Sequence, residues 1–259
     1  MSTWAMRHTL VLNKDKVVRW VMTSAFFAAA AFAATETLGS PPQVALPPAA
    51  EAISTPVNAS LPNATPPAPA WGMANIANPR VDNWVKRFTT SAKNDFAAAL
   101  NRGAQYLPMI TAKLEARDMP QELAYLPLIE SEYKTAARSR VSAVGMWQFM
   151  SGTARKLGLS VGRTVDERTN ASKSTDAALT YLSELHDQFG SWYLAAAAYN
   201  AGPGTVSKAM KRTLGRSTGS DSDFYAIAKS LPVETREYVP KLIAAARIGK
   251  DPGQYGLAD

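Results

Sequence analysis

The chain has 259 residues, of which 46% are hydrophobic and 19% are charged, and its formal net charge is +7. This length accommodates one ordinary globular domain with appendages. The absence of cysteine excludes a disulfide framework, a thiolate nucleophile and a cysteine-ligated zinc or iron–sulfur cluster, and with only two histidines the sequence predicts neither a metal site nor a metal cofactor.

The N-terminal residues 1–34 have the pattern of an export signal. A basic stretch precedes Trp20–Ala34, which is uncharged and largely apolar. Ala31 and Ala33 supply the small–x–small pattern that a signal peptidase needs, and the apolar run is shorter than the roughly 20 residues of a membrane-spanning helix. We therefore expect export to the periplasm. If the run is not cleaved, it would instead anchor the chain in the inner membrane.

Residues 35–77 have the composition of a disordered linker. Prolines are frequent between Pro41 and Pro69, and the segment has neither a helical nor a strand period. Because proline fixes φ and removes a backbone donor, such a segment cannot build a core. We expect it to tether a folded domain that comprises residues 78–259.

From Val81 to the end of the chain, the hydrophobic residues follow helical spacing. One apolar stripe runs from Val81 to Phe88, and a second runs from Ala178 to Phe189 after the candidate N-caps Asn170 and Ser172. Further helical segments begin after or at Pro120, Pro203 and Pro232. No alternating strand pattern persists, so the sequence predicts an all-α globular domain of roughly seven to nine short helices.

Glu130 is a carboxyl group in an apolar context. It follows Leu126–Ile129, and on a helix the first two of these residues lie on its own face one turn earlier. Burial against them would raise the pKa of Glu130 and allow it to act as a general acid near neutral pH. The alternative is a helix-end glutamate that points to solvent. The neighbouring Glu122 and Glu132 lie on other faces and are predicted to be solvated.

Three other segments contain polar groups in apolar surroundings. Within Ser139–Met150, the amide of Gln148 needs a backbone or ligand partner, and sugar hydroxyls and N-acetyl groups are suitable ligands. Tyr199 and Asn200 stand at a helix end, where Tyr199 is either a core residue or a donor to a carboxyl group or a sugar. Glu234 lies in the first turn of the last helix, where a carboxylate is ordinary helix-dipole chemistry.

These four segments occur in one order and together resemble the lytic transglycosylases with a goose-type lysozyme fold. The resemblance lies in Ile129–Tyr133, in Ser139 with Gly145 and Gln148, in Ala198–Gly202 and in Glu234–Val239. It implies a lysozyme-like helical domain and a lyase that acts on peptidoglycan. Such an enzyme cleaves the β-1,4 bond between N-acetylmuramic acid and N-acetylglucosamine and leaves 1,6-anhydro-N-acetylmuramic acid ends.

The resemblance also implies a role for each matching residue. Glu130 becomes the catalytic acid/base. The implied substrate-binding residues are Ser131, Ser139, Gln148, Met150, Tyr199, Asn200, Glu234 and Tyr238. Trp147 stands where the family usually has a smaller apolar residue, which would alter the wall of the groove.

The matched motifs place one carboxyl group, Glu130, in an apolar context, whereas most glycosidases use two carboxylates. The implied route therefore uses Glu130 twice and takes the C6 hydroxyl of the sugar as the nucleophile. Two alternatives stay open. One is a hydrolytic muramidase on the same fold, and the other is a non-catalytic peptidoglycan-binding protein. The presence of Glu130 argues against the second. The expected partners are glycan strands. Nucleic acid is not expected, because no basic cluster with interleaved aromatic residues is present.

Overall fold

The computed structural model describes residues 71–257. The export signal expected at residues 1–34 and the linker expected up to residue 70 lie outside this range. The described residues form ten α-helices and four 3₁₀-helices with isolated β-bridges and no strand, which confirms the all-α class for this part of the chain. The helices are more numerous than predicted because one-turn helices such as α5 (Ser151–Lys156) are too short to show a period.

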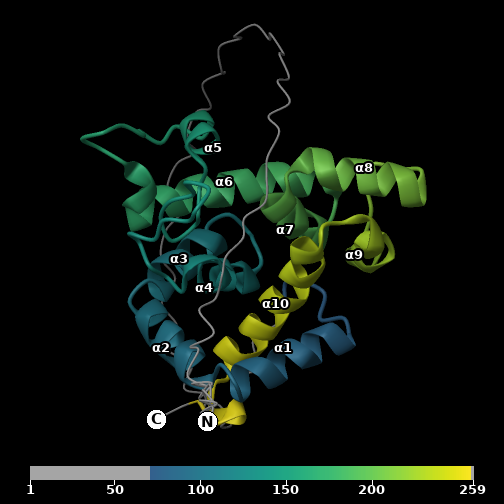
Figure 1. The fold of residues 1–259 in the computed structure, drawn as a ribbon, viewed down its shortest axis with the longest axis horizontal. Coiled ribbons are helices and arrows are strands. Elements are labelled where there is room, and N and C mark those ends of the chain that lie inside the picture. The colour runs from purple at the N-terminus through teal and green to yellow at the C-terminus, as the bar shows by residue number, and fades with distance from the viewer. Residues whose placement is uncertain (1–70, 258–259) are drawn as a thin grey trace, which may run out of the picture.

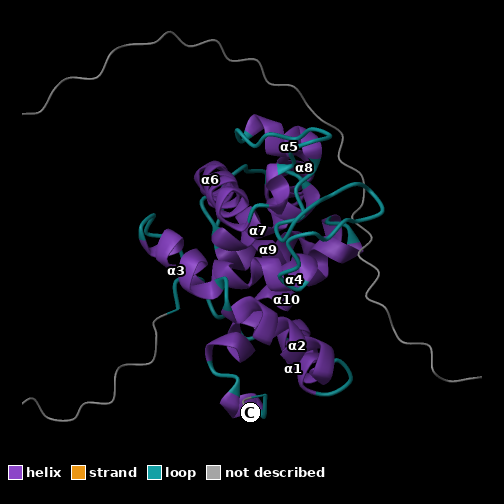
Figure 2. Ribbon diagram, turned by 90° about the vertical axis from the view of Figure 1, so that its left-hand side faces the viewer, coloured by secondary structure: helices purple, strands orange, loops and turns teal. Residues whose placement is uncertain are grey.

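The helices are connected by short turns except on either side of α5, where longer loops occur (Figure 2). In chain order the α-helices are α1 (Pro79–Thr89), α2 (Lys93–Ala104), α3 (Leu107–Glu115), α4 (Leu126–Ser131), α5, α6 (Ala171–Phe189), α7 (Trp192–Ala201), α8 (Pro203–Leu214), α9 (Asp221–Ile227) and α10 (Val233–Lys250). The 3₁₀-helices are η1 (Gln121–Tyr125), η2 (Glu167–Thr169), η3 (Ala228–Ser230) and η4 (Gly253–Tyr255).

The core lies between α10 and the helices that surround it. α10 packs against α1, α4, α7 and η1, while α6 packs against α7 (Figure 1). Ala195–Ala198 of α7 and Ala244–Ala246 of α10 are fully buried. Their small side chains allow helix axes to approach closely. No helix within residues 71–257 is both long enough and apolar enough to span a membrane.

Local sequence signals account for where most of the helices begin. The side chain of Asn170 caps α6 by accepting a hydrogen bond from the backbone N–H of Lys173 at 2.9 Å. Pro203 occupies the first turn of α8, and Pro232 directly precedes α10. Pro120 precedes a segment that starts as the 3₁₀-helix η1 and continues as α4. These predicted starts are confirmed, whereas the other N-cap candidate, Ser172, lies inside α6.

The structure corrects the N-terminal boundary of the domain. Residues 71–77 were predicted to belong to the linker, but they pack on the helices, and Met73 is only 1% exposed. The backbone N–H groups of Gly72 and Met73 both donate to Oε2 of Glu122 at 3.2 Å. Glu122 is fully buried and forms an ion pair with Lys250 of α10. The prediction that Glu122 is solvated is therefore wrong, because the segment that covers its carboxylate comes from a distant part of the sequence.

Candidate active site

Glu130 lies on α4, a helix of six residues that are all buried. The helix stops directly after Ser131 because Glu132 adopts the left-handed conformation, with φ at 56°, and its N–H donates to the carbonyl of Leu128. Only 9% of Glu130 is exposed. The short helix thus carries a carboxyl group into the interior, and the alternative of a glutamate that points to solvent is wrong. Glu132 itself is partly exposed.

Tyr238 of α10 contacts Glu130 directly. Its hydroxyl donates a hydrogen bond to Oε1 of Glu130 at 2.5 Å. Burial raises the pKa of Glu130 from 4.5 to about 7; the hydrogen bond from Tyr238 and the positive charge of Lys241 lower it, and the charge of Glu234 raises it. Both protonation states are therefore populated near neutral pH. A group that must donate a proton and then recover it requires this property.

Tyr199, near the end of α7, lies close enough to Glu130 for the charge of Glu130 to act on its hydroxyl. Its hydroxyl donates to the backbone carbonyl of Trp147 at 2.8 Å. Its ring lies 6.1 Å from that of Phe149 and 5.7 Å from that of Tyr181, measured between centroids. Burial raises the pKa of the Tyr199 hydroxyl well above its ordinary value, and the neighbouring charge of Glu130 adds to the effect. Tyr199 thus joins α7 to the loop that precedes α5.

That loop, residues 139–150, holds Gln148 and Met150, both partly exposed. Gly145 has a φ of +87°, and a Cβ at this position would lie 1.9 Å from the carbonyl oxygen of Arg168. Only glycine fits such a close approach. Gln148 also has a positive φ of 50°, and its Nε2 donates to the carbonyl of Gly145 at 2.7 Å. The backbone is therefore a partner of this amide, as the sequence analysis considered.

Ser131 and Ser139 are both bonded to the backbone. Ser131 is 4% exposed, and its hydroxyl donates to the carbonyl of Met146 at 2.8 Å. Ser139 is partly exposed, and its Oγ accepts from the N–H of Ala143 at 3.0 Å. Ser131 therefore links α4 to the loop of residues 139–150, while Ser139 stabilises a turn within that loop.

Asn200 and Glu234 connect the end of α7 to the start of α10. Oδ1 of Asn200 accepts a hydrogen bond from the hydroxyl of Thr235 at 2.8 Å. Burial raises the pKa of Glu234, and a hydrogen bond with the side chain of Asn200 opposes this rise. Because Glu234 also acts on Glu130 through its charge, the structure places a second carboxyl group near the first.

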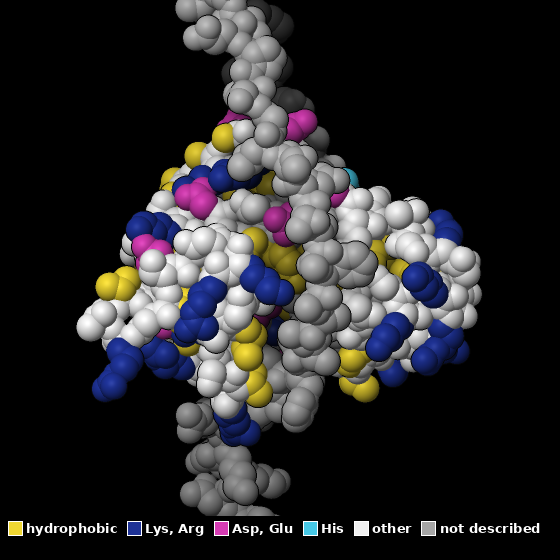
Figure 3. Space-filling view, turned by 90° about the horizontal axis from the view of Figure 1, so that it is seen from above, with side chains coloured by type: hydrophobic (Ala, Val, Ile, Leu, Met, Phe, Trp, Pro, Cys, Tyr) yellow, Lys and Arg dark blue, Asp and Glu magenta, His cyan; other side chains and the backbone are white. Residues whose placement is uncertain are grey.

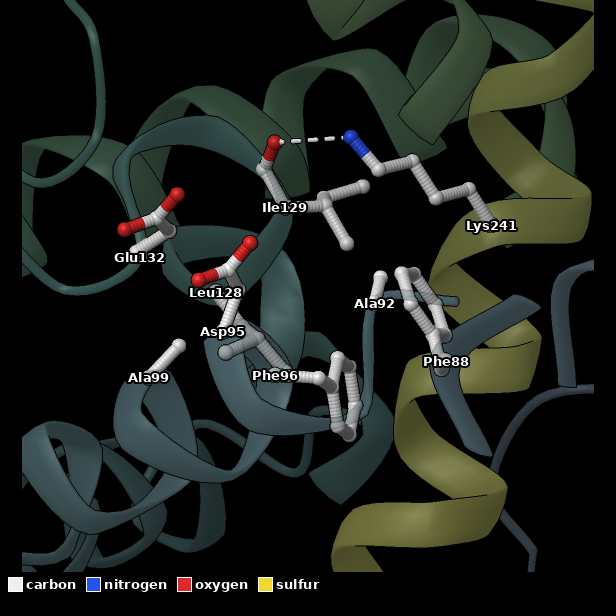
Figure 4. Close-up of a pocket in the computed structure, with 9 residues that line it drawn as sticks. All are labelled: Phe88, Ala92, Asp95, Phe96, Ala99, Leu128, Ile129, Glu132 and Lys241. Carbon is white, nitrogen blue, oxygen red and sulfur yellow. Dashed lines mark hydrogen bonds between the residues drawn. The ribbon is translucent and has the colours of Figure 1, made fainter. Parts of the chain in front are cut away.

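Lys241 belongs to this site, and the sequence analysis missed it. It lies on α10 three residues after Tyr238, and its Nζ donates to the carbonyl oxygen of Ile129 at 3.2 Å (Figure 4). Burial lowers the pKa of Lys241 to about 8, while the charges of Glu130 and Glu234 oppose this shift. The spacing from Tyr238 puts both residues on one face of the helix, which is the signal that could have identified it.

On the face seen from above in Figure 3, hydrophobic side chains are visible between Lys and Arg side chains, with Asp and Glu side chains among them. Within residues 71–257, no group of three or more His, Cys, Asp or Glu side chains is arranged to hold a metal ion.

Residues 108–220 match the family described as "Transglycosylase SLT domain". The membrane-bound lytic murein transglycosylase D of Escherichia coli K12 is 40% identical over 157 residues, which cover 60% of this chain and 34% of that protein. The soluble lytic murein transglycosylase of the same strain is 34% identical over 139 residues, or 49% of this chain and 20% of that protein. The chain thus spans about a third of the first relative's length.

Among solved structures, the lytic transglycosylase Slt of Pseudomonas aeruginosa aligns with a TM-score of 0.45 at 28% identity, over 58% of this chain and 25% of that chain. The family match includes Glu130, Gln148 and Tyr199 and ends before α10, which carries Tyr238 and Lys241. The family match and the sequence relatives confirm the resemblance inferred from the motifs. Residues 108–220 of this chain therefore match the transglycosylase SLT family, and the chain is similar to the lytic murein transglycosylases over the stretches given above.

Proposed function

We propose that this chain is a peptidoglycan lytic transglycosylase. It cleaves the β-1,4 bond between N-acetylmuramic acid and N-acetylglucosamine in glycan strands and leaves 1,6-anhydro-N-acetylmuramic acid ends. The observation that carries the proposal is the buried Glu130, whose pKa is raised to about 7 and whose Oε1 accepts a hydrogen bond from Tyr238. The match to the transglycosylase SLT family over residues 108–220 supports the same chemistry.

In the first step, Glu130 in its protonated form donates its proton to the glycosidic oxygen as the bond to C1 of N-acetylmuramic acid breaks. The sugar becomes oxocarbenium-like, and the N-acetylglucosamine portion leaves with a free hydroxyl group. Glu130 is now a carboxylate in a buried site. The hydroxyl of Tyr238 and the charge of Lys241 stabilise this form, as their lowering of the Glu130 pKa indicates.

In the second step, the carboxylate of Glu130 takes the proton from the C6 hydroxyl of the same sugar while O6 bonds to C1. The 1,6-anhydro ring closes, Glu130 is protonated again, and no water is consumed. An attached hydroxyl group has a high effective concentration, so a second carboxylate is not needed to position water. One acid/base with a pKa of about 7 thus serves both steps.

The remaining residues of the site would bind and orient the glycan. Gln148 and Met150 are partly exposed on the loop before α5, and Tyr199 and Asn200 are partly exposed at the end of α7. We propose that, together with Glu234 and Ser139, they line the groove beside the acid/base. The buried hydroxyl of Ser131 donates to the carbonyl of Met146 and so supports the loop. We assign groove contacts to the exposed members and a supporting role to Ser131.

The proposed substrate requires a location in the bacterial envelope. The similarity to a membrane-bound lytic murein transglycosylase supports this location. We further propose that residues 1–34 direct export to the periplasm, or anchor the chain in the inner membrane if they are retained, and that residues 35–70 tether the folded domain.

Hydrolysis is the competing activity, because Glu234 supplies a second carboxyl group near Glu130. A hydrolytic muramidase would use such a group to activate water. In this chain Glu234 is engaged by Asn200, which favours the intramolecular route.

Mass spectrometry of muropeptides released from purified sacculi distinguishes the two activities. A transglycosylase yields products lighter by one water than the reducing muropeptides. Reducing-end products from the wild type would instead establish hydrolysis, and the absence of any product would favour a non-catalytic wall-binding protein.

A further inference from the structure

Lys241 bridges α10 and the end of α4. Its Nζ donates to the carbonyl oxygen of Ile129, the residue directly before Glu130, at 3.2 Å (Figure 4). The last carbonyl groups of a helix lack partners within the helix, and α4 is only six residues long. A side-chain donor from another helix therefore fixes the end of α4, and with it the backbone that carries the acid/base.

The ammonium group is also set among carboxylates. Glu130, Glu234 and Glu132 all favour its charged form, whereas burial and the nearby Arg87 oppose it. Asp95 of α2 and Glu132 line the same small cavity of about 30 Å³, next to Lys241 (Figure 4).

The groups that face Glu130 come from two helices. α10 contributes Tyr238, Lys241 and Glu234, and α7 contributes Tyr199. Of these groups Lys241 alone is a cation. Its charge therefore favours the carboxylate form of Glu130, and the charge of Glu234 disfavours it.

We propose that Lys241 is a positioning residue for the reaction at Glu130: it holds the last turn of α4 in place and stabilises the carboxylate that forms when Glu130 gives up its proton. This inference rests on the proposed function. In a buried site, a fixed cation acts strongly on a charge that develops during the reaction, because little water is present to screen it. Lys241 acts through Glu130 and does not need to touch the sugar.

The direct test follows the titration of the Glu130 carboxyl carbon by NMR in the full chain without substrate. Lys241→Gln keeps a donor for the carbonyl of Ile129 but removes the charge. The midpoint of the Glu130 titration should therefore rise by about one pH unit. Lys241→Arg restores a cation and should return the midpoint to the wild-type value. An unchanged midpoint in Lys241→Gln would overturn the electrostatic role.

A control variant on the same helix separates charge from stability. Lys250→Met removes the cation that pairs with buried Glu122, far along α10 from the site, so it should destabilise the fold without moving the Glu130 midpoint. If Lys241→Gln does not fold, Lys241→Met replaces it in the comparison. Failure of both variants to fold while Lys241→Arg is stable would overturn the proposal in favour of a purely structural role.

Kinetics provide a second readout on glycan strands. Lys241→Gln should lower kcat about tenfold with little change in KM, and the fall of activity at alkaline pH should move to higher pH. A uniform loss at every pH without that displacement would contradict the proposal. If the wild type forms no anhydro product, the proposed function fails, while the NMR titration still decides the role of Lys241.

Discussion

Tyr238 and Glu130 are 108 positions apart in the sequence, and the hydroxyl of the first donates to the carboxyl of the second at 2.5 Å. Each side chain is more than nine-tenths buried, so the hydrogen bond forms where little water competes for it. The contact joins α4 to α10 and provides the acid/base with a fixed donor. The properties of Glu130 therefore depend on the last helix of the domain as well as on its own.

Glu130→Gln should abolish formation of anhydromuropeptides and leave the fold intact. Glutamine has nearly the shape of glutamic acid and can still accept from Tyr238, but it cannot donate and recover a proton. We expect product to fall below detection in mass spectrometry of digested sacculi, with an unchanged circular dichroism spectrum. Undiminished activity would indicate that Glu234, and not Glu130, is the catalytic acid.

The same variant should be more stable than the wild type at alkaline pH. The pKa of Glu130 is about 7 in the folded state and near 4.5 when unfolded, so between these values the folded state binds more protons. Wild-type stability therefore falls as pH rises through this window. A glutamine has no such penalty, and the gain should approach about 3 kcal/mol at pH 8 and be small at pH 5. Urea unfolding at both pH values measures it, and an equal gain at both would contradict the explanation.

Tyr199→Phe should lower activity more than stability. The change removes the hydrogen bond to the carbonyl of Trp147 but keeps the ring, so the expected cost is about 1 kcal/mol of unfolding free energy. Loss of the Tyr199 hydroxyl near Glu130 should lower kcat by about tenfold or more. Thermal unfolding and initial rates on the same samples test this. Activity lost only in proportion to the unfolded fraction would identify Tyr199 as a core residue.

Gly145→Ala should disrupt the loop that carries Gln148. The added Cβ would lie 1.9 Å from the carbonyl oxygen of Arg168, at a backbone φ of +87°. We expect destabilisation of about 3 kcal/mol or more and loss of activity.

Gly152→Ala is the matched control for Gly145→Ala. Apart from the adjoining residues and the backbone of α5 itself, no atom lies within 4 Å of a Cβ at this position, so alanine should be neutral or stabilising by up to about 1 kcal/mol. Equal effects of the two substitutions would show that the conformation of Gly145 is not required.

Glu122→Ala should destabilise the domain by about 3–5 kcal/mol, because Lys250 and two backbone N–H groups of residues 72–73 would lose their partner. Glu115→Ala removes an exposed carboxylate nearby and should change stability by less than about 0.5 kcal/mol. Denaturant unfolding of the two variants compares them. A small effect at Glu122 would mean that residues 71–77 do not stabilise the helices.

The helices could be predicted from the sequence where their own residues contain the signal. The apolar stripe from Val81 to Phe88 predicts α1, and the cap at Asn170 predicts the start of α6. The apolar neighbours of Glu130 likewise predict its burial, because residues one turn away on the same helix determine that environment. The order of the motifs was sufficient to indicate the lytic transglycosylase resemblance.

Only the tertiary structure decided which distant groups meet. Glu122 resembles a solvated helix residue in sequence, yet residues 71–77 and Lys250 cover it. Lys241 and Tyr238 reach Glu130 because α10 packs against α4, and their effects on its pKa depend on that contact. Hydrophobic periodicity shows which face of a helix is buried, but not which segment covers it. Burial of the acid was therefore a local property of the sequence, whereas the groups that control its proton were determined by packing.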